Sequence, residues 1–184
     1  MSKFEGRNKT ALLVIDVQNA VFGWAWRKDE VIANINKLVA DARAASTPVI
    51  WVQHSDEEMP IGSEAWDFMQ NLAKPEPGEE IIQKNFRSSF ENTNLDDMLA
   101  KLGISHLVVT GGETNNCVRH TSHAAIERGY DVTLVSDAHT TVDGAWGVEN
   151  LTAADIVAEQ NGSFSQYQLP GRYSKVETTS QVTF

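Results

Sequence analysis

Apolar residues follow two patterns that alternate along the chain. Short continuous apolar runs indicate strands buried on both faces, as in a parallel sheet. Segments with apolar residues every three or four positions indicate one face of a helix. The expected strands cover residues 10–16, 48–54, 80–84, 105–111 and 131–136. The expected helices cover residues 30–45, 95–102, 114–128 and 152–162.

Strands that alternate with helices predict right-handed crossovers and one doubly wound, mainly parallel sheet. The expected fold class is therefore α/β, with three α/β/α layers of the Rossmann-like kind. The 184 residues suit one domain over residues 1–184, with enough chain to bury a core. The tail over residues 174–184 has the composition of a strand, and is expected to be an edge strand or a dimer arm.

Residues 55–80 lack a clear period and contain three prolines and two glycines. A long irregular segment in a compact domain usually has a function, such as a lid or a subunit contact. Together with the 138–149 loop, this segment is expected to govern substrate specificity.

Composition narrows the partners. The formal charge of −10 argues against nucleic acids and anionic membranes, which both require a basic patch. No apolar run reaches 18 residues and no signal-peptide pattern opens the chain, so a cytoplasmic protein is expected. The single cysteine excludes an intrachain disulfide and any metal site built from several cysteines.

Three ionisable residues fall where expected strands end: Asp16, Lys84 and Cys117. Ligands of such sheets bind at the carboxyl ends of the strands. Each residue alone has an ordinary structural interpretation: Asp16 as a cap, Lys84 as a solvated charge, Cys117 as a small core residue. Together they form a coherent catalytic group for a hydrolase.

The turn before Cys117 supports that interpretation. Gly111 and Gly112 permit backbone conformations that other residues disfavour, and Thr114 or Asn115 can cap the next helix. Cys117 then falls in the first helical turn, where free N–H groups favour a thiolate and an oxyanion.

Asp16 is the expected proton shuttle, and Lys84 is the expected counter-charge for the carboxylate and the thiolate. None of the five histidines (His54, His106, His120, His123 and His139) has an evident claim to be the base.

Four ordered motifs resemble those of the isochorismatase-like cysteine hydrolase superfamily. They are Ala11-Leu-Leu-Val-Ile-Asp-Val-Gln-Asn19, Lys84-Asn-Phe-Arg-Ser-Ser-Phe90, Gly111-Gly-Glu-Thr-Asn-Asn-Cys-Val118 and Gly129-Tyr-Asp-Val-Thr-Leu-Val-Ser-Asp-Ala138. The resemblance covers nearly the whole chain.

This resemblance implies an Asp–Lys–Cys triad at Asp16, Lys84 and Cys117. It implies a non-proline cis peptide at Gly112–Glu113, with the backbone N–H groups of Glu113 and Cys117 facing the oxyanion. It also implies a homo-oligomer, either a dimer or a tetramer, that acts on a small molecule without a cofactor.

Nicotinamidases of this superfamily hold a metal through an Asp-x-His motif, whereas this chain reads His54-Ser-Asp56 in reverse order. We therefore expect no catalytic metal. Isochorismatases cleave a vinyl ether without depending on the cysteine, so the retained Cys117 favours amide hydrolysis. Vinyl-ether hydrolysis and a non-catalytic oligomeric or thiol redox role remain the alternatives.

The expected pocket wall is aromatic, because small-molecule sites are mostly apolar. The candidates are Phe22, Trp24, Phe90 and Trp146. Glu113 is either an ordinary surface residue or a pocket residue that favours cationic or hydrogen-bond-donating substrates.

Overall fold

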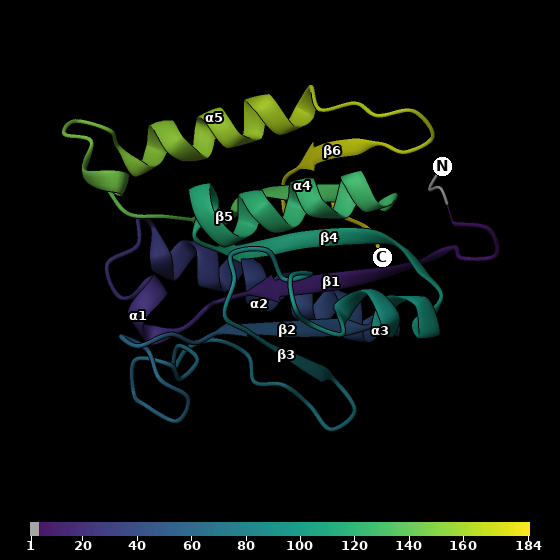
Figure 1. The fold of residues 1–184 in the computed structure, drawn as a ribbon, viewed down its shortest axis with the longest axis horizontal. Helices are drawn as coiled ribbons and strands as arrows, with labels where there is room; N and C mark the ends of the chain where they lie inside the picture. The colour runs from purple at the N-terminus through teal and green to yellow at the C-terminus, as the bar shows by residue number, and fades with distance from the viewer. Residues whose placement is uncertain (1–3) are drawn as a thin grey trace.

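The computed structural model describes residues 4–184, and within them six parallel strands form one sheet in the order β3-β2-β1-β4-β5-β6 (Figure 1). The strands are β1 (Lys9–Ile15), β2 (Val49–His54), β3 (Glu80–Lys84), β4 (Ile104–Gly112), β5 (Asp131–Thr140) and β6 (Ser174–Glu177). The predicted α/β class with a doubly wound parallel sheet is confirmed.

Helices cover both faces of the sheet. Helix α2 (Lys28–Ala44) packs on one face, where Ile35 and Leu38 meet Leu12 and Val14 of β1. Helices α3 (Leu95–Leu102), α4 (Arg119–Arg128) and α5 (Ala153–Ser165) contribute to the core on the other face. Because β1 faces apolar layers on both sides, its run over residues 11–15 is fully buried, as its continuous apolarity predicts.

The spacing of apolar residues does not reveal three short elements: helix α1 (Asn19–Phe22), the π-helical turn η1 (Thr114–Val118) and the 3₁₀ turn η2 (Ala145–Gly147). Each spans about one turn, which is too short to show a helical period. The helix predicted over 114–128 is thus a π turn followed by α4. Helix α5 also continues beyond the predicted end at residue 162, to Ser165.

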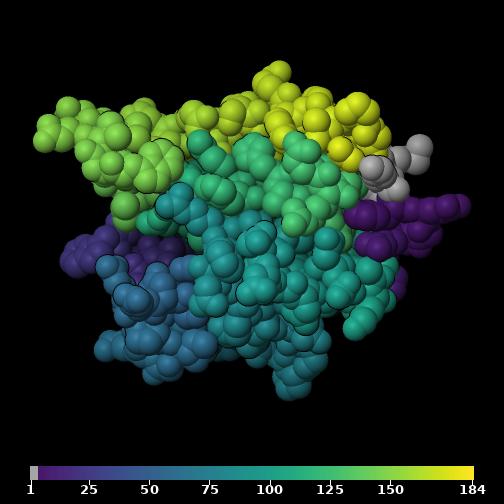
Figure 2. Space-filling view, in the orientation of Figure 1, coloured from purple at the N-terminus to yellow at the C-terminus, as the bar shows by residue number. Residues whose placement is uncertain are grey.

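The carboxyl ends of the parallel strands meet at one end of the molecule. Figure 2 shows three segments at that end: the α1 region, the loop between β2 and β3, and the loop between β5 and α5. The tail contributes β6, an edge strand paired with β5. No helix within residues 4–184 is long and apolar enough to cross a membrane.

Candidate active site

Asp16 directly follows β1 and has a positive φ of 50°, a conformation that aspartate tolerates better than most residues. Its backbone N–H donates to the Val52 carbonyl of β2 at 3.0 Å, so the chain stays attached to the sheet as it turns. The side chain is buried at the carboxyl edge of the sheet. The structure thus fixes this carboxylate instead of leaving it in solvent.

Lys84 ends β3, which is separated from β1 by β2. Its long side chain reaches across the end of β2, and its Nζ lies 2.7 Å from Oδ2 of Asp16. The two side chains are 0% and 1% exposed. Burial acts to lower the pKa of Lys84, but Asp16 and Cys117 act more strongly together and raise the pKa. The lysine is therefore an ammonium at neutral pH.

Cys117 lies in η1, directly before α4, and is partly buried. The Lys84 ammonium donates to its Sγ at 3.2 Å. One lysine thus contacts both the carboxylate and the thiol, and the structure brings together the three residues that the sequence singled out.

Two glycines make this arrangement possible. Gly111 has a φ of 116°, and a Cβ there would lie 2.0 Å from the Ile15 carbonyl oxygen. At Gly112 a Cβ would lie 2.8 Å from Cε2 of Phe22. Side chains at these positions would therefore push the turn away from β1 and α1. The peptide Gly112–Glu113 is cis, as the family resemblance implied.

The thiol is not poised as a free thiolate. Burial and the negative charge of Asp16 raise the pKa of Cys117 far above the ordinary value of 9.0, and the opposing effect of Lys84 does not cancel them. The predicted thiolate character of the resting cysteine is wrong, since sequence position alone does not reveal burial beside a carboxylate. In the resting site the cysteine is a thiol beside a candidate base.

A cavity of about 330 Å³ opens over this group. Polar, charged and apolar residues line it: Asp16, Ala20, Val21, His54, Asp56, Glu58, Met59, Arg87, Glu113, Asn116 and Cys117. Glu113 thus has a place in the pocket wall, where its carboxylate accepts a hydrogen bond from Nδ2 of Asn116 at 2.5 Å. The oxyanion role of the Glu113 and Cys117 backbone N–H groups stays a prediction.

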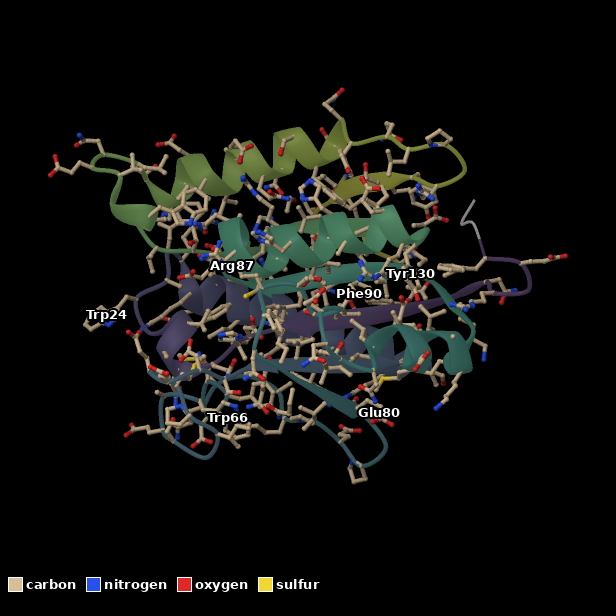
Figure 3. The ribbon with its side chains drawn as sticks, in the orientation of Figure 1. Trp24, Trp66, Glu80, Arg87, Phe90 and Tyr130 are labelled. Atoms are coloured by element: carbon tan, nitrogen blue, oxygen red, sulfur yellow. The ribbon has the colours of Figure 1, made fainter. Side chains whose placement is uncertain are left out.

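The predicted aromatic wall is wrong. Phe22 is fully buried against Gly112, and Phe90 belongs to the core, where it packs on Tyr130 at a ring-centroid distance of 5.8 Å. Trp24 is 91% exposed and Trp146 is 56% exposed, and neither lines the cavity. Figure 3 shows Trp24 pointing away from the body of the protein and Phe90 inside it.

Sequence reasoning missed eight of the residues that line the cavity. Five of them are polar: His54, Asp56, Glu58, Arg87 and Asn116. Figure 3 shows Arg87 near the start of α4. His54 ends β2, between the strands that carry Asp16 and Lys84. That position at a strand end was the available signal for His54.

Within residues 4–184 there is no group of three or more His, Cys, Asp or Glu side chains that could hold a metal ion. The expectation that catalysis needs no metal stays a prediction.

Comparison with known proteins identifies the family. The isochorismatase domain model matches residues 10–159, which include all three residues of the candidate triad. The chain belongs to the isochorismatase family. The match to this hydrolase family covers most of the chain.

The relatives of this isochorismatase-family chain include proteins with named activities. The streptothricin hydrolase of Streptomyces noursei is 34% identical over 139 residues, which are 72% of this chain and 55% of that protein. The ureidoacrylate amidohydrolase RutB of Enterobacter sp. (strain 638) is 34% identical over 170 residues, 70% of this chain and 74% of that protein. The chain thus spans about half the length of the first relative.

A solved structure supports the same assignment. The crystal structure of an isochorismatase from Pseudomonas putida KT2440 matches with a TM-score of 0.85 and 28% identity, covering 98% of this chain and 94% of that one. The isochorismatase-family fold therefore extends over nearly all of this chain.

Proposed function

We propose that this isochorismatase-family protein hydrolyses a small-molecule amide through a thioester on Cys117. The observation that carries the proposal is the position of the Lys84 ammonium, 2.7 Å from the Asp16 carboxylate and 3.2 Å from the Cys117 sulfur, beside an open cavity. The cation thus contacts both the candidate nucleophile and the candidate base, and a nucleophile held near its base favours covalent catalysis.

Attack begins from the thiol. Asp16 takes the proton of Cys117 as the sulfur bonds to the amide carbon, and the carbonyl π electrons move to oxygen. The raised thiol pKa makes this transfer necessary, because little free thiolate exists at neutral pH. Lys84 stays protonated and stabilises the negative charge as it passes from the Asp16 carboxylate to the former carbonyl oxygen of the amide.

Collapse of the tetrahedral intermediate breaks the C–N bond. Asp16 returns its proton to the departing nitrogen, so that ammonia or an amine leaves and a thioester remains. Asp16 then takes a proton from water as the hydroxyl oxygen attacks the thioester. The C–S bond breaks, the acid departs and the proton returns to the sulfur, which restores the resting site.

The cavity favours a small polar substrate. Besides Asp16, it presents the carboxylates of Asp56, Glu58 and Glu113 against the single guanidinium of Arg87. This excess of negative charge favours amides that carry a positive charge or several N–H donors. Its volume of about 330 Å³ is at the small end of ligand sites.

The test is an ammonia-release screen over small amides, ureas and lactams, with Cys117→Ala and Cys117→Ser as matched variants. We expect turnover in the wild type, loss in both variants, and an acyl adduct on the only cysteine in mass spectra of the quenched reaction. Full amide turnover by Cys117→Ala would show that Cys117 is not the nucleophile.

The same variants separate the alternatives. A vinyl-ether hydrolase would keep its activity in Cys117→Ala and lose it in Asp16→Ala. A thiol redox protein would oxidise readily at Cys117 without turning over any amide. The raised pKa of Cys117 argues against that last role, because redox-sensing cysteines have low pKa values.

A further inference from the structure

We infer that His54 and Asp56 are positioning residues, which hold the Lys84 ammonium in the orientation that reaches both Asp16 and Cys117. The inference deepens the proposed function and rests on it only for the importance of that orientation. It rests on a series of side-chain hydrogen bonds that runs from Asp56 through His54 to Lys84.

Lys84 Nζ has three N–H groups and three acceptors around it. Two acceptors are Asp16 Oδ2 and Cys117 Sγ, and the third is His54 Nδ1 at 3.4 Å. His54 and Lys84 are register partners at the ends of β2 and β3. The lysine must cross the end of β2 to reach β1, so the last residue of β2 lies beside its path.

The hydrogen-bond roles determine the tautomer of His54. An ammonium can only donate, so Nδ1 must accept and therefore carries no hydrogen. The hydrogen then lies on Nε2, which is 3.2 Å from Oδ2 of Asp56. The Asp56 carboxylate stabilises this tautomer, and with it the third acceptor of Lys84.

Hydrogen bonds to the rest of the protein anchor both His54 and Asp56. The buried Gln18 side chain receives a hydrogen bond from the His54 N–H at 2.9 Å and donates to the His54 carbonyl at 3.0 Å. Oδ1 of Asp56 accepts from the backbone N–H groups of Glu58 at 3.0 Å and Met59 at 2.8 Å. Side-chain changes at residue 54 therefore leave these backbone anchors in place.

The test replaces one ring nitrogen at a time. In His54→Asn, the amide oxygen can occupy the place of Nδ1 and accept from Lys84. His54→Gln can place a polar group only near Nε2. His54→Leu matches asparagine in size but accepts nothing. If His54 acts through Nδ1, the Asn variant should keep the reactivity of Cys117, and the Gln and Leu variants should lose it.

The measurement is the rate at which iodoacetamide alkylates Cys117 at a fixed alkaline pH, with the pH dependence of that rate. Cys117 is the only cysteine, so the label reports one site, and no amide substrate is needed. A misplaced ammonium lowers the thiolate fraction, so we expect a rate about tenfold lower in Leu and Gln, which corresponds to one unit in the thiol pKa. The Asn variant should stay within about threefold of the wild type.

Asp56→Asn provides a second, independent arm. Oδ1 of Asp56 already accepts two backbone N–H groups, so the amide oxygen must take that place and the NH₂ must face His54. That donor moves the ring hydrogen to Nδ1 and removes the acceptor of Lys84. Asp56→Asn should therefore slow alkylation about tenfold in the wild type, and less than about twofold in His54→Asn.

Equal rates in His54→Asn and His54→Leu would overturn the inference, as would additive effects of the two asparagine substitutions. Circular dichroism and urea unfolding identify a variant that has lost its fold. Because alkylation requires no amide, a failed substrate screen would count against the proposed function and leave this test intact.

Discussion

The ion pair between Lys84 and Asp16 is buried almost completely, with 2.7 Å between Nζ and Oδ2 and at most 1% of either side chain exposed. The structure accommodates two charges at the edge of an apolar sheet because each neutralises the other. The same pair is the centre of the proposed catalytic group, so we expect stability and activity both to depend on this contact.

Removing the lysine alone should therefore be costly. We expect Lys84→Met to lower the free energy of unfolding by about 3–5 kcal/mol, because it leaves Asp16 buried without its counter-charge. The measurement is urea unfolding at neutral pH. The double variant Lys84→Met with Asp16→Asn should regain part of this stability without regaining activity. A double variant as unstable as the sum of its parts would show that the pair does not act as a unit.

The raised pKa values predict a loss of stability at alkaline pH. The unfolded chain releases the Cys117 proton near the ordinary pKa of 9.0, whereas the folded chain retains it. The contribution of Cys117 is complete below that pH and is lost as the pH rises toward the folded value. Lys84 follows the same rule above its ordinary pKa of 10.5, because its pKa is also raised.

Comparison with Cys117→Ser isolates the thiol in this prediction. Above about pH 9, the wild type should lose stability relative to the serine variant by up to about 1.4 kcal/mol per pH unit. Urea unfolding of both proteins from about pH 8 to about pH 10 measures the difference. Parallel pH curves would mean that the thiol titrates alike in the folded and unfolded chains.

Gly111→Ala should destabilise the fold through a close contact. Its Cβ would lie 2.0 Å from the Ile15 carbonyl oxygen at a φ of 116°. Gly78→Ala is a matched control, since its φ is 95° and nothing lies within 4 Å of the added Cβ. We expect Gly78→Ala to cost roughly 1–2 kcal/mol for the backbone conformation and Gly111→Ala clearly more. Thermal unfolding compares them, and equal losses would contradict the close approach of β4 to β1.

Strands that are buried on both faces were predictable because they consist of continuous apolar runs in the sequence. The continuous apolar runs that became β1 and β2 are bounded by polar residues or a proline, and their limits agree with the prediction within a residue or two. Gly103 and Gly129 end α3 and α4 in the left-handed conformation that glycine allows.

The pocket wall was not predictable in the same way. Aromatic residues serve cores, pockets and surfaces alike, so residue type did not separate Phe22 and Phe90 in the core from Trp24 at the surface. His54 has no evident claim to be the base in the sequence, although its strand end lies between those of Asp16 and Lys84. Which side chains meet across three strands depends on register and reach, which one sequence does not state.

Some expectations concern properties beyond one chain. The homo-oligomer and the cytoplasmic location stay predictions. The exposure of Trp24 at 91% makes it a candidate for the oligomer contact, and light scattering of wild type and Trp24→Ser would test that role. A lower mass for the serine variant at the same concentration is the expected result.

Glu113 offers a test of substrate charge. Its carboxylate lines the cavity, and Nδ2 of Asn116 donates to it. In Glu113→Gln the amide oxygen can still accept that hydrogen bond, so the wall keeps its shape while it loses a negative charge. We expect KM for cationic amides from the screen to rise about tenfold, with kcat little changed and neutral amides affected less than about twofold.

The control is a neutral amide that differs from the cationic amide only by lacking its amino group. The kcat and KM of both amides are measured in the wild type and in Glu113→Gln at one ionic strength, because salt screens such interactions. A selective rise for the cationic amide assigns Glu113 to substrate recognition. An equal rise for both members of the pair would instead place its effect in the turn that carries Cys117, where residues 112 and 113 are joined by the cis peptide.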